Sequence, residues 1–383
     1  MVNNLNKKIG IIGAGQLAQL LAHRAYQLGI KILCFADNNY QNPPAALLSD
    51  VFYGDLNNQD DLKKFSDQVD FITIENENID IKTLEFLLSL KKLYPSIKSI
   101  KAAQDRLLEK QLFTDLNINL AKFLDISDLD KINNIDYGVN GDFEGDSESD
   151  SESDFYNNFN QSILKTRTLG YDGKGQVRIS LDNKNNKNII ANAFNEIGSA
   201  PAVLEKKIDF VNEISQISAR DIYGNIVHYP IIENHHEDGI LRESFCKVKD
   251  EFLIQNHDKL SELSQKYITD LLNNLDYVGV LALELFVLPD CSILANEMAP
   301  RVHNSGHLTN EAFYCGQFEM HLRAVSGEKV FTPKQICNAK MVNLIGDIKP
   351  EDYNLSENYR VYDYGKDFRS GRKVGHKVLR LFD

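Results

Sequence analysis

Two glutamates, Glu284 and Glu297, lie on either side of a short turn in the segment VGVLALELFVLPDCSILANEMAP. A hairpin closed symmetrically about Asp290 and Cys291 places the two carboxylates directly opposite each other. Like charges that face each other across an antiparallel pair destabilise it, so the pairing requires a cation. The hairpin therefore predicts a Mg²⁺ site.

A glycine-rich turn near the start of the chain predicts anion binding. GAGQLA, Gly13–Ala18, follows a strand-like run and opens a helical pattern, as in a dinucleotide-binding turn. The acid that such a turn needs at the end of the next strand can be Asp37. Because the physics requires only an anion at a helix N-terminus, another phosphorylated ligand is the interpretation we favour, and a tight turn without a ligand stays open.

A second glycine-rich segment, GYDGKGQ, lies between two strand-like runs, with Lys165 upstream on the first. Its glycines let backbone N–H groups close over phosphate oxygens, and Lys165 and Lys174 add positive charge. The G-x-x-x-x-G-K-[ST] spacing of a Walker loop is absent. We therefore favour a nucleotide held under a flexible β-hairpin over a flexible turn without a ligand.

Three further segments concentrate histidine and basic residues. In ENHHEDGILRES the two histidines are adjacent, so on a strand they point to opposite faces, which disfavours a shared zinc ion. In NEMAPRVHNSGH, Arg301 and His303 can stabilise an anionic intermediate beside Mg²⁺. The segment YGKDFRSGRKVGH gathers cations that suit a phosphate clamp: Lys366, Arg369, Arg372 and Lys373. Surface ion pairs are the alternative for both basic segments.

Composition indicates an ordinary globular protein. The chain has 383 residues, of which 43% are hydrophobic, enough for two or three domains. Its apolar runs are far shorter than the roughly 18 residues of a membrane span, and no signal-like region precedes the first strand, so we expect no membrane association and a cytoplasmic location. The cysteines are scattered without CxxC spacing, which predicts buried thiols rather than disulfides: Cys34, Cys246, Cys291, Cys315 and Cys337.

The net charge of −13 argues against nucleic acid as a partner. One run, GDFEGDSESDSESD from Gly141 to Asp154, holds seven acids and no bases, which leaves −6 for the rest of the chain. A segment of this composition cannot bury enough apolar surface to offset its ordering entropy. We therefore expect a disordered acidic insertion at 140–161.

The elements that must position these residues fall into three groups. Strand, turn, helix and strand patterns in residues 1–95 predict a doubly wound α/β unit. From Ser162 to about Pro230 the runs SILKTR, QVRISL, PAVLEKKI and NEISQISA predict antiparallel sheet. A helix from Asp258 to Leu275 leads into the glutamate hairpin, and a β-rich piece follows Pro333.

Taken together, the motifs resemble the ATP-grasp superfamily and, within it, the PurK family of 5-(carboxyamino)imidazole ribonucleotide synthetases. The resemblance covers nearly the whole chain, through GAGQL, AQDRLLEK, LKTRTLGYDGKGQ, HYPIIENHHEDGILRES, GVLALELF, NEMAPRVHNSGH, QFEMHLRAV and GRKVGH. It implies an α/β and α+β chain of ATP-grasp architecture: an N-terminal doubly wound parallel-sheet domain at 1–95, an ATP-grasp domain at 96–325 with a β-rich lid around 162–210, and a small β-rich C-terminal domain at 326–383.

The resemblance also implies an activity. Members of the family use ATP to carboxylate 5-aminoimidazole ribonucleotide with bicarbonate through carboxyphosphate, in purine biosynthesis, and form homodimers. Alternatives are another ATP-grasp ligase, such as a glycinamide ribonucleotide transformylase or a biotin carboxylase, a non-catalytic nucleotide-binding relative, and an NAD-dependent oxidoreductase built on the first domain. The last leaves the glutamate hairpin and GYDGKGQ unexplained.

The residue roles implied by the resemblance form three sets. Glu284 and Glu297 would hold Mg²⁺, and Arg301, His303 and Asp172 would act on the carboxyphosphate and the acceptor. The ATP contacts would be Arg106, Lys165, Gly170, Tyr171, Asp172, Gly173, Lys174, Gly175, Gln176, Glu205, Lys206, Lys207, Ile208, Glu213, His236, Asn296 and Glu297. The acceptor ribonucleotide would be bound by Gln16, Leu17, Glu75, Tyr171, Asp172, and, at its 5′-phosphate, Lys366 and Arg372.

The chain departs from the family pattern at a few positions. The acidic insertion precedes Lys165, where relatives have a short connection. Leu169 replaces a glycine usual before GYDG, which we expect to stiffen the lid, Leu308 stands where an aromatic is common, and Lys206 is an unusual hinge residue. None of these changes removes a charged group that the chemistry requires.

Overall fold

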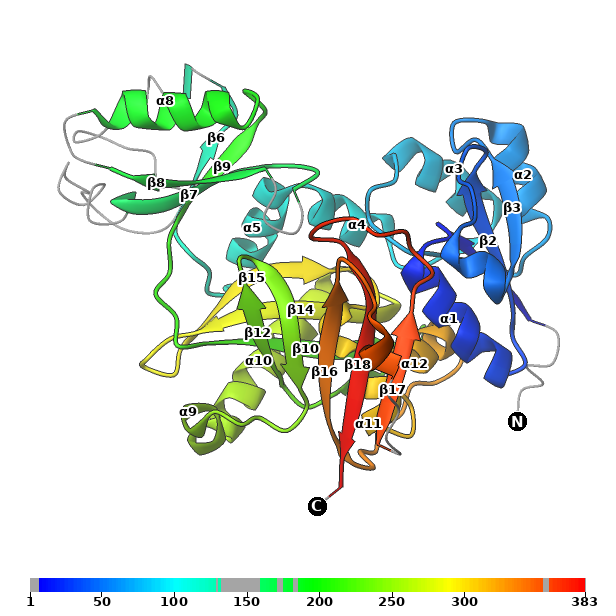
Figure 1. Cartoon of the computed structure of the whole chain (residues 1–383). Coiled ribbons are helices and arrows are strands. Elements are labelled where there is room, and N and C mark those ends of the chain that lie inside the picture. Colours follow the sequence, from blue (N-terminus) through cyan, green and yellow to red (C-terminus); the bar gives the residue numbers. More distant parts are fainter. Residues whose placement is uncertain are drawn as a thin grey trace.

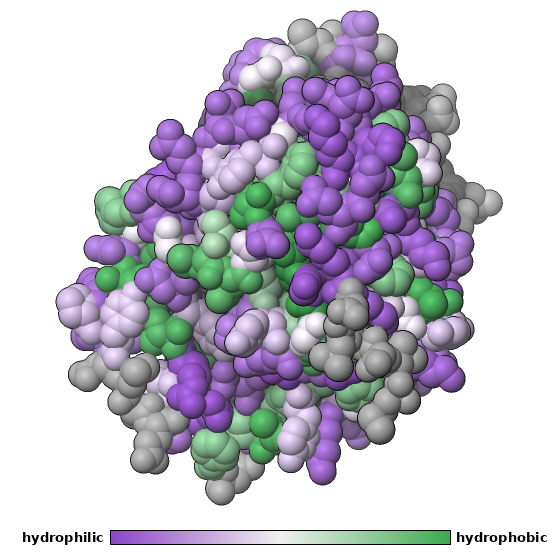
Figure 2. Space-filling model, turned by 90° about the vertical axis from the view of Figure 1, so that its right-hand side faces the viewer, coloured by the Kyte–Doolittle hydropathy of each residue, from purple (hydrophilic) through white to green (hydrophobic). Residues whose placement is uncertain are grey.

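The computed structural model describes residues 7–128, 130–131, 159–170, 175–181, 185–353 and 358–382, and its described strands form three sheets (Figure 1). The expected acidic insertion lies outside the described residues except for its last positions. Hydrophilic side chains cover most of the face in Figure 2, with smaller hydrophobic areas between them, as on ordinary globular proteins. In the described part of the chain, no helix is both long and apolar enough to cross a bilayer.

The N-terminal sheet is parallel, with strand order β3-β2-β1-β4-β5. Its strands are β1 (Lys8–Ile12), β2 (Lys31–Asp37), β3 (Asp50–Gly54), β4 (Phe71–Ile74) and β5 (Lys92–Leu93). Helix α1 (Gln16–Gln27) covers one face, while α2 (Gln59–Ser66) and α3 (Ile81–Leu90) cover the other. Because both faces are buried, the strands read as continuous apolar runs. The doubly wound parallel sheet predicted from the sequence is confirmed.

Two short helices lead out of this sheet. α4 (Ile97–Gln104) and α5 (Arg106–Asp115) meet at Asp105, whose carboxylate accepts the backbone N–H of Leu107 at the start of α5. Such a side-chain cap satisfies one of the unpaired N–H groups at a helix N-terminus. Asp105 also forms an ion pair with Arg167, so the start of α5 is tied to the segment that follows β7.

A small antiparallel sheet with strand order β6-β9-β7-β8 stands apart at the upper left of Figure 1. Its strands are β6 (Phe123–Ile126), β7 (Gln161–Thr166), β8 (Gln176–Ser180) and β9 (Ala202–Lys206). Helix α8 (Asn186–Glu196), which we did not expect, covers one face and shares an apolar cluster with Leu164 and Ile179. The run NEISQISA forms an antiparallel strand, as predicted, and this strand, β10 (Asn212–Arg220), lies in the central sheet rather than in the small one.

The central sheet has nine strands in the order β15-β14-β10-β12-β13-β16-β18-β17, with β11 paired to β10. Its strands are β10 (Asn212–Arg220), β11 (Ile226–His228), β12 (Ile232–Glu237), β13 (Ile240–Phe245), β14 (Gly279–Val287), β15 (Ile293–Ala299), β16 (Asn338–Ile345), β17 (Tyr359–Asp363) and β18 (Lys373–Leu381). The C-terminal strands therefore extend this sheet, since β16 pairs with β13.

Helices cover both faces of the central sheet. α10 (His257–Asn274), the helix predicted before the hairpin, packs against Leu281, Leu283 and Leu285 of β14. α12 (Gln317–Val325) packs against the intervening residues of β14 and also against α1, so it joins the central sheet to the first one. Other short helices in the described residues are η1 (Pro44–Leu47), α9 (Glu251–Gln255), η2 (Asn304–Gly306), α11 (Thr309–Ala312) and η3 (Pro350–Tyr353).

The five cysteines carry free thiols. Burial of Cys34, Cys246 and Cys315 confirms the interpretation for these three, and it raises the pKa of each thiol. The expectation was wrong for Cys291 and Cys337, which are half-buried. Cys291 lies in the turn of the glutamate hairpin with φ of 63°, where its neighbours leave it partly open to solvent.

Candidate active site

Glu284 of β14 pairs directly with Glu297 of β15, as the sequence predicted. The hairpin turn pairs Val287 with Ile293, which is one residue out of the expected symmetric register. A β-bulge at Asn296 restores the pairing of the two glutamates. Without the bulge, Glu297 would share the face of Ile293 and Ala295, which pack against α10. The bulge therefore turns Glu297 toward Glu284.

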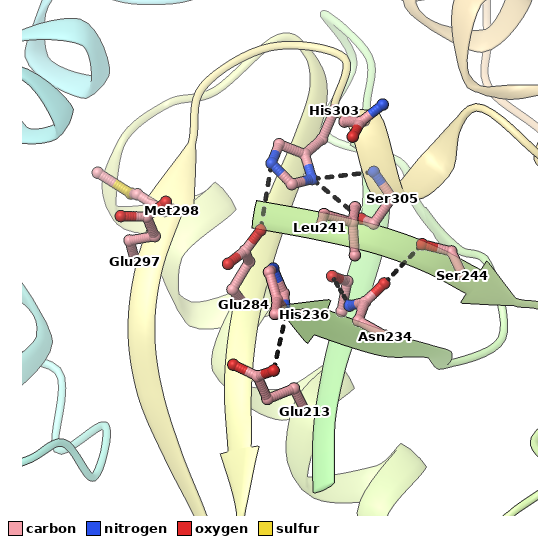
Figure 3. Close-up of polar contacts among 12 residues, drawn as sticks. Glu213, Asn234, His236, Leu241, Ser244, Glu284, Glu297, Met298, His303 and Ser305 are labelled. Carbon is pink, nitrogen blue, oxygen red and sulfur yellow. Dashed lines mark hydrogen bonds and ion pairs between the residues drawn. The ribbon is translucent and has the colours of Figure 1, made fainter. Parts of the chain in front are cut away.

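Each of the two carboxylates has a nitrogen-bearing neighbour, a histidine for Glu284 and an arginine for Glu297. His303 Nε2 lies 3.2 Å from Glu284 Oε1 (Figure 3), and Arg106 Nη1 lies 3.2 Å from Glu297 Oε2. Burial and the charge of Glu297 raise the pKa of Glu284 to about 7. A divalent cation bound by both carboxylates would relieve this repulsion, so the pair fits the hard, oxygen-ligated ion that the sequence predicted.

The two histidines of β12 face different surroundings, as predicted. His236 Nδ1 lies 2.7 Å from Glu213 Oε2, whereas His235 is exposed and lies 3.8 Å from Glu237. Burial would lower the pKa of His236, but its hydrogen bond with Glu213 and the charges of Glu284 and Glu213 raise it. Figure 3 shows His236 and Glu213 beside Glu284, so the structure brings these three predicted residues together.

A chain of buried charges runs from α5 to the lid. Glu205 at the end of β9 accepts Lys165 Nζ at 2.9 Å, and its other oxygen lies 3.1 Å from Lys110 Nζ. Burial would raise the pKa of Glu205, but the two lysines outweigh it and lower the pKa to about 2. Lys110 was missed by the sequence analysis, although AQDRLLEK contains it. A lysine next to a glutamate on a helix gives no signal by itself, because it is typical of a solvated face.

Arg106 joins the glutamate hairpin to the lid. Besides its ion pair with Glu297, its Nη2 donates to the carbonyl oxygen of Gly170 at 3.1 Å, and its backbone N–H donates to Arg167 O at 2.9 Å. Glu109, which lies one turn after Arg106 on α5, accepts the backbone N–H of Met298 at 2.7 Å. Arg106 therefore lies where both the metal-binding pair and the glycine-rich loop can be reached.

The glycine-rich loop is described at its two ends. Gly175 has φ of +70°, and a Cβ there would lie 2.7 Å from Thr166 Oγ1, so the position requires glycine. Leu169, which replaces the glycine expected before GYDG, has φ of 62° and is 73% exposed. It therefore occupies a conformation that favours glycine. Four predicted residues lie outside the described part of the chain: Tyr171, Asp172, Gly173 and Lys174.

The predicted hinge, Glu205 to Ile208, is held mainly by its backbone. The N–H of Lys206 donates to Lys122 O and that of Lys207 to Gln161 O, both at 2.9 Å. The Lys207 side chain is partly exposed and lies 3.6 Å from Asp209, and Ile208 is half-buried. Gln176 is the first residue of β8 and pairs with Lys165 across the sheet. The backbone of the hinge is therefore held to β7 and to the residue that precedes β6.

Arg301 and His303 follow the hairpin into the centre of the site. Arg301 forms a two-point ion pair with Glu77, with Nε to Oε2 at 2.6 Å and Nη2 to Oε1 at 3.1 Å. His303 Nδ1 lies 2.9 Å from Ser305 Oγ, and burial together with Arg301 lowers the pKa of His303 well below its usual value. The ion pair of Arg301 is therefore mostly buried and not a surface ion pair. Its partner, Glu77, was not predicted from the sequence.

A cavity of about 380 Å³ opens at the carboxyl edge of the N-terminal sheet. It brings together Gln16 of α1 and Glu75, which follows β4, with Lys366 and Arg372 from the segment between β17 and β18, and Lys366 donates to Gln16. The C-terminal strands of the central sheet thus reach a pocket of a different domain. Leu17 does not line the cavity, because its side chain is buried in the core.

Glu75 occupies the start of α1. Its carboxylate accepts the backbone N–H of Gly15 at 2.6 Å and that of Leu17 at 3.3 Å. Burial raises the pKa of Glu75, although these hydrogen bonds and the charge of Lys366 oppose the shift. Asp37, considered as the acid of a dinucleotide site, lines the same cavity. The favoured interpretation of a phosphate bound directly at this helix N-terminus does not agree with the position of Glu75.

Comparison with known families agrees with this architecture. Residues 6–104 match the ribonucleotide synthetase pre-ATP-grasp domain, residues 142–318 match the ATP-grasp domain, and residues 339–379 match the phosphoribosylaminoimidazole carboxylase C-terminal domain. Together with the lid, the glutamate hairpin and the charged chain from α5, these matches define an ATP-grasp enzyme, which is an ATP-dependent ligase.

Relatives narrow the class to one family. The N5-carboxyaminoimidazole ribonucleotide synthase of Pseudomonas aeruginosa is 36% identical over 379 residues, which cover 98% of this chain and 95% of that protein. The crystal structure of the corresponding synthetase from Thermus thermophilus superposes with a TM-score of 0.83 at 32% identity, covering 97% and 93% of the two chains. That of the Staphylococcus aureus enzyme complexed with ADP gives 0.80 at 26% identity, covering 100% and 95%. The chain belongs to the N5-carboxyaminoimidazole ribonucleotide synthase family.

Proposed function

We propose that the protein carboxylates 5-aminoimidazole ribonucleotide with bicarbonate at the expense of ATP, through carboxyphosphate, to give 5-(carboxyamino)imidazole ribonucleotide, ADP and phosphate. The observation that carries the proposal is the two-point ion pair between Arg301 and Glu77. It joins the glutamate hairpin to the segment that lines the cationic cavity. A nucleotide site and a ribonucleotide site thereby share one reaction centre.

ATP fits between the lid and the central sheet. Lys165 and Arg106 supply positive charge for its phosphates, Glu205 holds Lys165 in place, and the hinge after β9 would contact the base. Glu213, His236 and Asn296 line the neighbouring part of the site, and Tyr171 to Gln176 would close over the phosphates. Glu284 and Glu297 would hold Mg²⁺, which when bound neutralises phosphate oxygens.

Arg301 and His303 face the position where carboxyphosphate would form. Arg301 is positively charged at every relevant pH, and preorganised positive charge stabilises an anionic intermediate. His303 is held between Glu284 and Ser305 and is neutral. It therefore adds no second positive charge beside Arg301, and its imidazole can accept a proton during the reaction. Asp172 stays a predicted member of the catalytic set, since it lies outside the described residues.

The cavity suits the acceptor ribonucleotide. Lys366 and Arg372 would bind its 5′-phosphate by charge-assisted hydrogen bonds, while Gln16 and Glu75 would contact its sugar and base. Leu17 can contribute only its backbone, given its buried side chain. Tyr171 and Asp172 stay predictions for the acceptor, as do the homodimer and the cytoplasmic location.

Two observations weigh against the alternatives. Glu75 already accepts the N–H groups of Gly15 and Leu17, where the pyrophosphate of NAD would bind. Two cations lining the cavity, Lys366 and Arg372, indicate a phosphorylated acceptor, as opposed to the uncharged ring of biotin. Another ATP-grasp ligase with a phosphorylated acceptor is the alternative that the experiment must separate.

The test is to mix the protein with Mg-ATP, bicarbonate and 5-aminoimidazole ribonucleotide and to follow both ADP formation and incorporation of ¹⁴C from labelled bicarbonate. We expect one carboxylated product per ADP, and little ADP when the acceptor is left out. A parallel reaction contains glycinamide ribonucleotide with formate. Faster ADP formation in that reaction, without ¹⁴C incorporation in the first, would replace the proposal by the alternative ligase.

A further inference from the structure

Glu77 lies on the segment that follows β4, and it reaches across to Arg301, a residue 224 positions away in the chain. Both side chains are mostly buried, with 20% of Arg301 and 19% of Glu77 exposed. Burial would raise the pKa of Glu77, but the charge of Arg301 and its hydrogen bonds lower it. The two-point pair is therefore ionised and geometrically fixed.

The contacts of Arg301 fix one edge of its guanidinium. Nε and Nη2 donate to Glu77, and Nη1 donates to Val302 O at 3.3 Å. Among the described residues these contacts use three of the five N–H bonds of an arginine. Without Glu77, the same guanidinium would be drawn to other carboxylates, because the charges of Glu297 and Glu75 also act on it.

Glu77 is itself held by its backbone. Its carbonyl oxygen accepts Gln104 Nε2 at 2.5 Å and the N–H of Ile79 at 2.8 Å. Gln104 is the last residue of α4, directly before Asp105 and Arg106, which contact the lid. The segment from Glu75 to Ile79 therefore contacts the acceptor cavity, Arg301 and the helix junction under the lid.

We propose that Glu77 is a positioning residue, which holds Arg301 at the carboxyphosphate and so couples ATP cleavage to carboxylation of the acceptor. The proposal rests on the proposed function. A misplaced Arg301 would leave ATP bound but the intermediate poorly stabilised, and a small displacement at a reacting centre costs a large factor in rate. Carboxyphosphate that is not captured by the acceptor would be lost to water.

The test compares Glu77→Gln with the wild type. Glutamine has nearly the same shape but removes the charge and one acceptor, so Arg301 loses its two-point contact. We expect kcat for carboxylation to fall about tenfold or more, with the KM for ATP within about twofold. We also expect more than one ADP per carboxylated product. A purely structural role would lower expression and the melting temperature without changing that ratio.

A double-mutant cycle shows whether Glu77 acts through Arg301. In an Arg301→Met background, Glu77→Gln should have little further effect on kcat, because the group it positions is already gone. Glu77→Asp keeps the charge and should recover part of the coupling. The matched control is Arg24→Gln, which breaks the ion pair between α1 and α12 at the same domain junction, away from the site, and should leave the ADP-to-product ratio at one.

Two outcomes would overturn the proposal. One is wild-type kcat and coupling in Glu77→Gln, and the other is an equal loss of kcat from Glu77→Gln with and without Arg301. If the wild-type protein itself does not carboxylate the aminoimidazole acceptor, the proposed function fails instead. In that case the cycle is repeated on bicarbonate-dependent ATP hydrolysis, where non-additive effects of Glu77 and Arg301 would still support the positioning role.

Discussion

The carboxylate of Glu75 accepts a hydrogen bond from the backbone N–H of Gly15 at 2.6 Å. The residue directly after β4 thereby occupies the anion-binding position at the start of α1, where the helix dipole favours negative charge. The glycines of the dinucleotide-like fingerprint therefore leave room for the carboxylate of Glu75 rather than for a bound phosphate. A Cβ at Gly15 would overlap that carboxylate.

Gly15→Ala should displace Glu75 and impair the cavity. Forcing an extra methyl group into a packed position costs typically about 1–3 kcal/mol of stability, so we expect the melting temperature to fall and, because Glu75 is displaced, the KM for the aminoimidazole acceptor to rise. The KM for ATP should change little, because the ATP site lies elsewhere. Steady-state kinetics with each substrate varied in turn measure both. In a Glu75→Ala background, Gly15→Ala should lower the melting temperature much less than it does alone, and equal losses would contradict the assignment.

Glu297→Gln should nearly abolish turnover, since it removes half of the negative charge of the metal-binding pair. Glu284→Gln should behave similarly. The measurement is ADP formation as a function of Mg²⁺ concentration, and isothermal titration of Mg-ATP gives binding separately. Glu237→Gln, on the exposed end of β12, is the control and should keep its activity. Normal turnover of Glu297→Gln would refute the metal assignment.

Lys366→Ala and Arg372→Ala should each raise the KM for the acceptor. A charge-assisted phosphate contact is worth about 1.5–3 kcal/mol, or roughly ten- to a hundredfold. Arg369→Ala provides a matched control, because Arg369 is an exposed cation of the same segment that does not line the cavity. An acceptor KM that is unchanged in both variants, or raised equally in Arg369→Ala, would refute the assignment of Lys366 and Arg372 to the acceptor's phosphate.

Glu205→Gln should destabilise the protein, because it removes the ion-pair partner of the buried Lys110. Breaking a buried ion pair on one side costs about 3–5 kcal/mol. The pKa of Glu205 is lowered from 4.5 to about 2, so its stabilisation is complete above about pH 4.5 and is lost as the pH falls toward 2. Urea unfolding of both proteins should therefore show a difference at pH 7 that shrinks below pH 4. Asp67→Asn, which removes a surface ion pair, should cost at most about 1 kcal/mol at any pH.

The acidic run from Gly141 to Asp154 lies outside the described residues, and we expect it to be dispensable for the chemistry. Replacing it with a short Gly/Ser bridge should leave kcat and both KM values within about threefold, because distant surface charge is screened beyond roughly 8–10 Å at moderate salt. The measurement is steady-state kinetics at low and high salt. ATP binding that becomes tighter only at low salt would instead show that the run repels the triphosphate.

Local patterns were sufficient to predict the parallel sheet and α10, because apolar periodicity reflects burial directly. They were also sufficient to predict that Glu284 and Glu297 face each other. The predicted reason was incomplete, since a bulge such as that at Asn296 leaves no mark in the sequence. The antiparallel strand β10 was predicted, but the sheet that it joins was not, because an alternating pattern indicates a strand and not its neighbours.

The partners of the charged residues could not be predicted. Glu77 and Arg301 are 224 positions apart, and nothing in either segment indicates the other. Lys110 lies on α5 and Glu205 on β9 of the lid, so only the packing of α5 under the lid brings them together. The occupied start of α1 likewise depends on Glu75, which is 60 positions from Gly15. Such contacts depend on the tertiary structure. The pKa shifts of the charged residues in the site depend on these contacts and could not be predicted either.

The order of the chain has a consequence for its synthesis. The contact between Gln16 and Lys366 spans 350 positions, so one wall of the cavity leaves the ribosome long before the cations of the other. Domains generally fold as units, N-terminal first. A nascent chain therefore acquires a folded first domain without a phosphate-binding pocket, and the acceptor can be captured only after β16 to β18 have joined the central sheet. Ligand-induced protection of the N-terminal domain from protease should accordingly appear only in chains that carry this last hairpin.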